Sequence, residues 1–183
     1  MTLYFITGNQ GKLKEAQRFI PRIEGRNSEL SEIQSLSLEE VVIHKALSLV
    51  NQYTGCPFIV EDSSLQLEGM NGLPGTFIKW FERTIKLEGI ADLARKQDNP
   101  TAHAESSIAY YDGKNLPLHV FSGSVHGTVV YPRGEQDFGW GKIFVPDGCL
   151  ETFAEMGPEK KDQISMRAIA FKKLKIYLEE NGR

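Results

Sequence analysis

The residues that most clearly could bind a ligand or take part in a reaction follow a short apolar segment near the N-terminus. Thr7-Gly8-Asn9 comes directly after residues 3–6, Leu-Tyr-Phe-Ile, and Lys12 opens a stretch with helical spacing over residues 13–20. A chain that leaves a strand, turns and enters a helix presents backbone N–H groups and the positive end of the helix dipole. This segment predicts an anion site, with phosphate as the commonest anion; the alternative is a tight turn with one solvated lysine. It is not a Walker A loop, because Leu13 rather than Ser or Thr follows the lysine.

Two adjacent carboxylates, Glu61 and Asp62, follow a second apolar segment, Phe58-Ile59-Val60. The short continuous apolar run is typical of a central strand. Acidic residues at the end of a buried strand are a common way to hold a divalent metal beside a phosphate. The alternative is a solvated turn at the strand end, in which Asp62 caps the next segment.

Two further segments place unusual side chains together. Phe138 and Trp140 flank Gly139 in a segment with too many glycines for a regular strand. It is either a loop that clamps a flat ring or ordinary core packing. Ser165 and Arg167 lie in the first turn or so of the last predicted helix, where a positive charge opposes the helix dipole. Local conflicts of that kind gather at functional sites.

The elements that must position these residues alternate between strands and helices. Ser37-Leu38-Glu39-Glu40 is a capping box that opens a helix. The strands are expected at residues 3–6, at a segment ending near residue 30, at 58–60, at 103–111 and within 117–130. The helices are expected at about 13–20, at 37–53, at 76–96 with a break at Gly89, at 152–155 as a short capped piece, and at 162–180.

Composition excludes several classes of protein. The chain has 183 residues, which suits one domain, and a net charge of −3, which favours neither nucleic acid nor an acidic membrane. No segment approaches the about 18 consecutive apolar residues of a membrane span, and no signal peptide is recognisable. The histidines lack zinc-ligand spacing. Cys56 and Cys149 are far apart, so we expect two thiols in a reducing cytoplasm, with a disulfide between them as the alternative.

Taken together, these segments resemble the inosine triphosphate pyrophosphatase family, which hydrolyses aberrant purine nucleoside triphosphates. The resemblance covers nearly the whole chain and depends on the order and spacing of many short pieces. These are Thr7-Gly8-Asn9 with Lys12 and Glu15, residues 30–34, Glu40 with Lys45-Ala46, residues 60–62, residues 72–75 with 78–81, residues 132–134, residues 137–140, residues 146–148, residues 153–156, and Ser165 with Arg167.

The resemblance implies an α/β fold with an elongated, curved mixed sheet flanked by helices, and two lobes around a nucleotide cleft. It implies one domain over residues 1–183, a homodimer and a Mg²⁺ cofactor. The expected reaction is hydrolysis of deaminated purine triphosphates (ITP, dITP, XTP) to the monophosphate and pyrophosphate, which cleanses the nucleotide pool.

We assign roles to individual residues on this basis. Glu32 and Asp62 are expected to hold Mg²⁺, with Glu61 as a weaker candidate, and Asp62 also to orient or deprotonate the attacking water. The catalytic set is Asp62, Lys12 and Glu32. The phosphate-binding residues are Thr7, Gly8, Asn9, Lys12 and Lys45, with Lys161 and Arg167 from the opposite lobe. The base-binding residues are Phe138, Gly139, Trp140, Ser165 and Arg167.

Two positions depart from the family pattern. Gly141 stands where the family usually has Asp, and Met166 where it has His. Both missing side chains are expected to face the base, so an altered preference for GTP or pyrimidine triphosphates is the alternative. A non-catalytic nucleotide-binding relic is a further alternative, but Lys12, Glu32, Lys45 and Asp62 argue against it, because a binder does not need the metal carboxylates.

Overall fold

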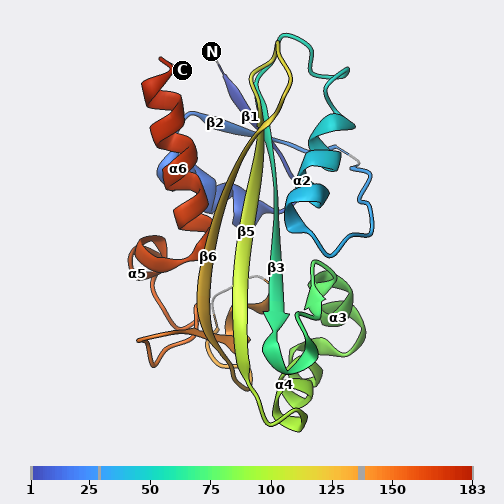
Figure 1. Ribbon diagram of the computed structural model, residues 1–183. Helices are drawn as coiled ribbons and strands as arrows, with labels where there is room; N and C mark the ends of the chain where they lie inside the picture. The colour runs from blue at the N-terminus through green and yellow to red at the C-terminus, as the bar shows by residue number, and fades with distance from the viewer. Residues whose placement is uncertain (1, 29, 136–138, 183) are drawn as a thin grey trace. The chain divides into compact units, whose positions relative to one another are not determined.

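The computed structural model describes residues 2–28, 30–135 and 139–182, and in this part of the chain seven strands form one mixed sheet (Figure 1). The strand order is β2-β1-β3-β5-β6-β7, with β4 (Pro74–Gly75) paired to β3. β1 (Leu3–Ile6) pairs in parallel with β2 (Ile23–Arg26) and β3 (Phe58–Leu67). β6 (His119–Val129) and β7 (Phe144–Pro146) are antiparallel. The predicted α/β fold, a mixed sheet flanked by helices, is confirmed.

The chain divides into two compact units, and each is described by itself. The first unit comprises Met1–Asp62, Ser106–Gly123 and Arg167–Arg183, and the second comprises Ser63–Glu105 and Ser124–Met166. The strands β3, β5 (Thr101–Tyr111) and β6 contribute residues to both units.

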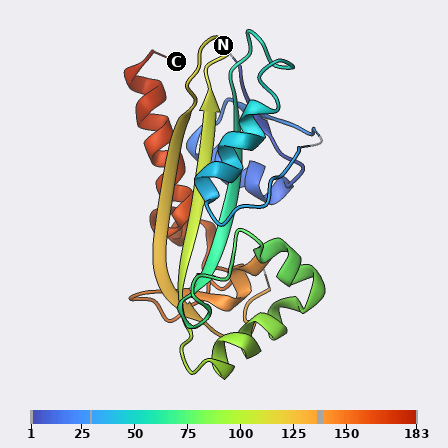
Figure 2. The same cartoon turned by 45° about the vertical axis from the view of Figure 1, so that its right-hand side comes forward.

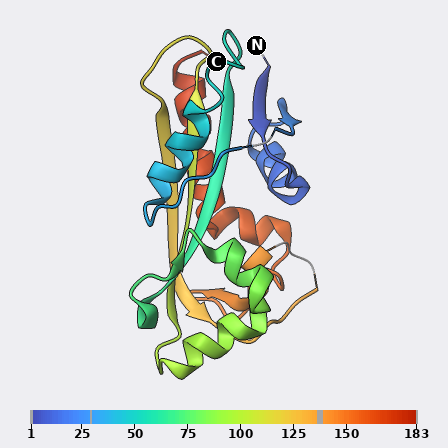
Figure 3. The same cartoon turned by 90° about the vertical axis from the view of Figure 1, so that its right-hand side faces the viewer.

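In the first unit, helices cover both faces of the sheet. α1 (Gln10–Phe19) and α2 (Leu38–Leu47) lie on opposite sides of β3 (Figure 3). α6 (Met166–Glu180) runs along β5 and β6 (Figures 1 and 2), where Lys173 Nζ donates to the Ser122 carbonyl at 2.7 Å.

The alternation of side chains along the strands assigns each residue to one of these faces. In β3, Ile59 packs in the cluster with α1 and α6, whereas Phe58 and Val60 pack in the cluster with α2. In β5, Ile108 faces α1 and α6, whereas Ala109 faces α2. Because successive strand residues point to opposite faces, odd positions of β3 and even positions of β5 face α1 and α6.

The predicted capping box opens α2, but the helix is shorter than expected. Ser37 Oγ accepts the Glu40 N–H at 3.3 Å, which confirms the cap. The helix ends at Leu47 rather than near residue 53, and a series of turns follows. Leu49 and Tyr53 are nevertheless buried, so the apolar spacing predicted burial correctly and helix length incorrectly.

The second unit contains the two helices predicted over residues 76–96, but the break is elsewhere. α3 (Ile78–Thr84) and α4 (Lys86–Lys96) meet at Lys86, whose φ is 64°. Gly89 lies inside α4, and a Cβ there would come within 2.8 Å of the Ile85 Cβ. The glycine therefore serves close packing, and the prediction that it breaks the helix was wrong.

Three other boundaries differ from the prediction. The last helix is two helices, α5 (Pro158–Ile164) and α6, separated at Ser165, which is extended with φ −70° and ψ 150°. Residues 152–155 form a turn, in which Thr152 Oγ1 accepts the Glu155 N–H, rather than a helix. β2 ends at Arg26 rather than near residue 30.

The core of the second unit is a single apolar cluster. The second unit also contains two short 3₁₀ helices, η1 (Glu68–Met70) after β3 and η2 (Gly139–Ile143) before β7. Cys149 packs against this cluster, and both it and Cys56 are free thiols, as predicted. Within the described residues, no helix is both long enough and apolar enough to cross a membrane.

The pairing of β6 with β7 requires a glycine at position 127. A Cβ there would lie 2.3 Å from the Val145 carbonyl oxygen and 2.7 Å from Phe144 Cζ. We expect Gly127→Ser to lower the free energy of unfolding by about 2 kcal/mol or more, since the strands must separate to admit it. Urea denaturation measures this. Gly157→Ser is the control, because nothing lies within 4 Å of its Cβ position and serine caps α5 well; equal losses in both variants would contradict the assignment.

Candidate functional site

The turn between β1 and α1 is fixed by its own side chains. Thr7 Oγ1 accepts the Asn9 N–H at 3.1 Å, and Asn9 Oδ1 accepts the Lys12 N–H at 3.0 Å as the cap of α1. A Cβ on Gly8 would lie 3.2 Å from Asn27 Oδ1, so a glycine suits this close approach. The predicted strand–turn–helix at residues 3–20 is confirmed, and it places Lys12 in the first turn.

Glu61 and Asp62 lie inside β3, not at its end. The strand runs from Phe58 to Leu67, so the expectation of a strand-end turn, with or without Asp62 as a cap, was wrong. The parallel register pairs Phe5 with Ile59, and β1 ends one residue later. β1 therefore stops just before the level of Glu61, and strand alternation directs Glu61 toward α1 and α6 and Asp62 toward α2.

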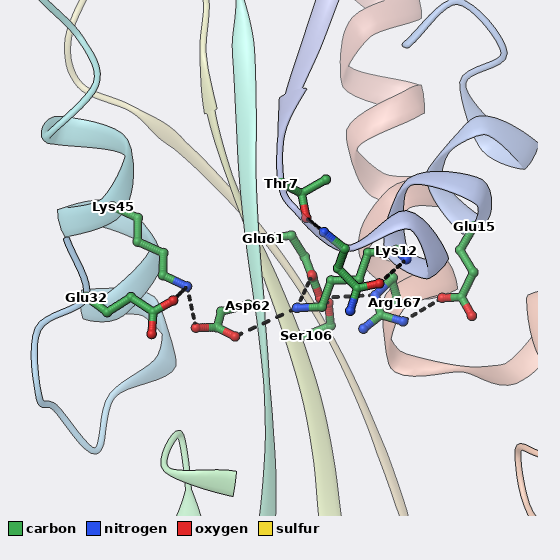
Figure 4. Close-up of polar contacts among 10 residues, drawn as sticks. Thr7, Lys12, Glu15, Glu32, Lys45, Glu61, Asp62, Ser106 and Arg167 are labelled. Atoms are coloured by element: carbon green, nitrogen blue, oxygen red, sulfur yellow. Dashed lines mark hydrogen bonds and ion pairs between the residues drawn. The ribbon is translucent and has the colours of Figure 1, made fainter. Parts of the chain in front are cut away.

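Glu61 is a fully buried carboxylate with polar partners on both oxygens (Figure 4). Its Oε1 accepts from Ser106 Oγ at 2.6 Å and from Arg167 Nε at 3.1 Å. Its Oε2 lies 2.7 Å from Lys12 Nζ. Partners from α1, β5 and α6 therefore converge on one side chain of β3.

Arg167 continues this network to α1. Its Nη1 lies 2.5 Å from Glu15 Oε2, and the residue is only 4% exposed. Desolvation costs several kcal/mol for an isolated buried ion, so the arginine needs the two carboxylates as partners. Its Nε and Nη1 groups donate to Glu61 and Glu15, so these two donors do not favour the direct base contact expected from the sequence.

Asp62 joins the network to α2. Its Oδ2 accepts from Lys45 Nζ at 2.7 Å, and its Oδ1 lies 3.8 Å from Lys12 Nζ. Lys45 Nζ also lies 3.1 Å from Glu32 Oε1. The side chain of Lys45 is buried, whereas those of Asp62 and Glu32 are 22% and 39% exposed. This part of the network is therefore open to a ligand (Figure 4).

The buried charges perturb one another's protonation. Burial raises the pKa of Glu61, but the positive charges of Arg167 and Lys12 outweigh it and hold the pKa at about 2. For Arg167, burial lowers the pKa, but Glu61 and Glu15 outweigh it and raise it. Burial likewise lowers the pKa of Lys45, while Asp62 and Glu32 raise it, with a net increase. All three groups are charged at neutral pH.

The carboxylates differ in their suitability for a metal. Among the described residues, no group of three or more His, Cys, Asp or Glu side chains is arranged to hold a metal ion by itself. Glu32 and Asp62 are partly exposed, and one cation, the Lys45 amino group, already contacts both. They fit a Mg²⁺ ion that takes one or two carboxylates and completes its shell with phosphate and water. Glu61 does not fit, because it is fully buried and cations occupy both of its oxygens.

The second unit holds the other predicted site residues. Trp140 is 6% exposed and packs edge-on against Phe144 in the core cluster, so its environment is that of core packing. Lys161 is buried, with Nζ 5.7 Å from the Phe153 ring centroid. Ser165 is buried between α5 and α6. Gly139 begins η2 with φ 68°, a conformation that favours glycine, and Phe138 lies outside the described residues.

The two departures from the family pattern are both buried. Met166 is 3% exposed and belongs to the core cluster of the second unit. Gly141 is buried within η2, and its carbonyl accepts the Ala154 N–H at 3.2 Å. A histidine or an aspartate at these positions would therefore have to be accommodated in a packed environment.

Sequence reasoning missed two members of the network. Ser106 was not singled out, although two adjacent serines in the apolar strand segment 106–111 are a signal, because buried hydroxyls need partners. Glu15 was noted only as part of a motif. It lies three residues after Lys12, and this spacing places both side chains on one face of α1.

The comparisons with known proteins agree with this architecture. A sequence model of the Ham1 family matches residues 3–177. The chain is 39% identical to an inosine triphosphate pyrophosphatase of Kluyveromyces lactis, with 98% of this chain and 97% of the relative covered. It is 39% identical to a dITP/XTP pyrophosphatase of Thermococcus kodakarensis, with 99% of each covered. The solved Ham1 protein of Staphylococcus aureus matches in fold, with a TM-score of 0.83 and 24% identity over 99% of this chain and 100% of that one.

The depressed pKa of Glu61 predicts a specific acid sensitivity. A folded pKa of about 2, against 4.5 for the ordinary group, means that ionised Glu61 stabilises the fold above pH 4.5 and loses this effect as pH falls toward 2. The full effect corresponds to about 3 kcal/mol. Urea unfolding of wild type and Glu61→Gln should give free energies that differ most near pH 6 and converge toward pH 2. Glu180→Gln, at the exposed end of α6, is the control and should parallel wild type; a pH-independent gap for Glu61→Gln would contradict the assignment.

Proposed function

The chain belongs to the Ham1 family, and from this membership and the geometry of the site we propose that it is a nucleoside triphosphate pyrophosphatase. It hydrolyses a nucleoside triphosphate to the monophosphate and pyrophosphate. The proposed substrates are deaminated purine triphosphates (ITP, dITP and XTP), in keeping with the names of the relatives from Kluyveromyces lactis and Thermococcus kodakarensis.

The observation that carries the proposal is the arrangement of two lysines around Asp62. Lys45 and Lys12 approach its two oxygens at 2.7 and 3.8 Å, beside the turn that opens α1. A nucleoside triphosphate carries about four negative charges, and catalysis of phosphoryl transfer consists mainly of positioning and charge neutralisation. Two ammonium groups and a helix N-terminus supply this neutralisation.

Glu32 and Asp62 would hold the Mg²⁺ ion. When bound, Mg²⁺ would take carboxylate and phosphate oxygens as ligands and neutralise phosphate charge. Lys45 contacts both carboxylates, and its amino group is proposed to bind a phosphate oxygen of the substrate. Glu61 is not part of the proposed metal site; its carboxylate supports Lys12.

The residues of the first unit divide the remaining work. The backbone of Thr7 and Gly8, the Asn9 side chain and Lys12 hold the phosphates. Asp62 orients the attacking water in line with the pyrophosphate leaving group and accepts its proton. The attack is proposed to fall on the α-phosphorus, so that pyrophosphate is the leaving group.

Recognition of the base is assigned to the second unit. We propose this role for Gly139, Trp140 and Ser165, although Trp140 is buried in the core cluster and packs against Phe144. Lys161 is proposed to add charge for the phosphates. Arg167 is reassigned to the charge network, where it holds Glu61.

An altered base preference remains the second candidate, and Met166 is the observation that favours it. A buried methionine cannot donate the hydrogen bond that a histidine would supply to a 6-oxo group. The site would thus lack a donor to the 6-oxo group, which is the group that distinguishes these purines from adenine.

Three further properties are part of the proposal. We propose that the two units are the lobes of one domain over residues 1–183, since three strands contribute to both. We also propose that the protein is a homodimer and acts in the cytoplasm. Light scattering of the purified chain tests the dimer, and fractionation of cells tests the location.

The first test of the function is pyrophosphate release by Asp62→Asn. We expect turnover to fall by about 10²–10³ or more, because the variant loses a metal ligand and a charge that acts on the transition state. Initial rates with ITP, with and without Mg²⁺, measure this. Asp112→Asn, in the turn after β5, is the control and should retain wild-type turnover. Turnover of Asp62→Asn within a few-fold of wild type would remove Asp62 from the mechanism.

The second test is a nucleotide panel with wild type and Met166→His. One donor that ATP leaves unsatisfied corresponds to roughly 5- to 150-fold preference for ITP and XTP over ATP. Because Arg167 is bound by Glu15 and Glu61 and Met166 cannot donate, we expect the wild-type preference to fall below this range. Met166→His should widen this preference. Met156→His, in the same core cluster, is the control and should lower stability but leave the substrate preference unchanged. Values of kcat/KM for ITP, XTP, GTP, ATP, dUTP and CTP decide the matter. A pyrimidine triphosphate that outperforms ITP would establish the second candidate instead.

A further inference from the structure

The charged residue that connects the buried network to the open part of the site is Lys12. Its side chain is 16% exposed, whereas that of Glu61, its nearest partner, is fully buried. The amino group lies 2.7 Å from Glu61 Oε2 but 3.8 Å from Asp62 Oδ1. Lys12 is therefore held by the buried carboxylate and only approaches the exposed one, which leaves Asp62 Oδ2 to Lys45.

The orientation of the Glu61 carboxylate depends on what binds its other oxygen. Oε1 accepts two hydrogen bonds, from Ser106 Oγ at 2.6 Å and from Arg167 Nε at 3.1 Å. Ser106 is completely buried in β5 and faces α1 and α6, the same face as Glu61. Two donors fixed to different elements define the plane of the carboxylate, and this plane directs Oε2 at Lys12.

A lysine has a flexible four-carbon stem and gains its position from its partners. Without a fixed acceptor, the ammonium group would sample many rotamers, and phosphate binding would have to order it. A preorganised donor avoids this cost at the moment of binding. The ammonium group has three donors, so an ion pair with Glu61 leaves donor capacity for phosphate oxygens.

We propose that Ser106 is a positioning residue for phosphate binding, which acts through Glu61 to hold the Lys12 ammonium group toward the triphosphate. The proposal rests on the proposed function for the role of Lys12 toward phosphate. It makes the serine hydroxyl, rather than the arginine alone, the group that sets the direction of the carboxylate.

The chain provides a matched control in the next residue. Ser107 is also fully buried in β5, and its hydroxyl bonds to Ser122 Oγ at 2.7 Å. It faces the opposite side of the sheet from Glu61. Ser106→Ala and Ser107→Ala therefore remove the same hydroxyl group from the same strand, but only the first touches the Lys12 network.

The kinetic experiment compares both variants in pyrophosphate release from ITP. Ser106→Ala should lower kcat/KM about 10- to 100-fold, the range for one lost hydrogen bond to a charged group, mainly through a higher KM. The kcat/KM of Ser107→Ala should stay within about threefold of wild type, because loss of a buried hydrogen bond outside the Lys12 network lowers stability rather than activity. In the Glu61→Gln background, Ser106→Ala should have no further effect, because the two residues act as one unit.

A second readout separates this proposal from the proposed function. Labelling of lysines with an amine-reactive reagent, quantified by mass spectrometry, reports on Lys12 in the protein alone. We expect Lys12 to react several-fold faster in Ser106→Ala and Glu61→Gln than in wild type and Ser107→Ala, because an amine released from a fixed ion pair is more accessible. Lys175, exposed on α6, is the internal reference.

The outcomes are distinct. Failure to release pyrophosphate from any triphosphate, with the labelling difference present, removes the proposed function and retains the positioning of Lys12. Equal Lys12 labelling in Ser106→Ala and Ser107→Ala overturns the positioning role, whatever the activity. If Ser106→Ala does not fold, Ser106→Cys, with a similar size and a weak donor, should show the same changes with smaller amplitude.

Discussion

The first unit depends on one buried charge, the guanidinium of Arg167. It lies between Glu15 of α1 and Glu61 of β3, and thus joins a terminal helix to an N-terminal helix and a central strand. Removal of one member of such a network leaves an uncompensated buried charge, which typically costs 3–5 kcal/mol. A buried ion pair is weak evidence for stability, but it is a strict geometric constraint. This constraint joins α6 to α1 and β3, and together with Ser106 it orients the Glu61 carboxylate that contacts Lys12.

The same constraint separates structural charge from chemical charge. Glu15, Arg167 and Glu61 satisfy one another within the protein, while the buried Lys45 contacts two partly exposed carboxylates, Asp62 and Glu32. Lys12 is the link between the two groups. A ligand that enters beside Asp62 therefore meets side chains whose positions are set by residues it never touches, which is the usual requirement for a preorganised polar site.

The parts of this site that the sequence predicted are those determined by local interactions. The turn at Thr7–Asn9 and the cap at Ser37 depend on hydrogen bonds over two or three residues, and both are found as expected. The break before α4 was misplaced because the packing of Gly89 against Ile85 and the positive φ of Lys86 are not visible in residue type. The length of β3 and the burial of Arg167 depend on partners that are distant in the chain: Ser106 is 45 residues from Glu61, and Arg167 is 106. No spacing rule along the chain identifies such partners.

The two carboxylates of β3 owe their different environments to strand register alone. Glu61 and Asp62 are neighbours of the same charge, and the alternation that starts from the pairing of Phe58 and Ile59 with β1 makes one buried and the other partly exposed. An insertion or deletion of a single residue between Ile59 and Glu61 would exchange the faces of Glu61 and Asp62. Glu61 would then point toward α2 and lose its contact with Arg167. Substitutions near this segment change one contact at a time, but a change of length reverses the whole arrangement. We infer that descendants of this chain can vary in residue type around β3 much more freely than in the number of residues that lead to it.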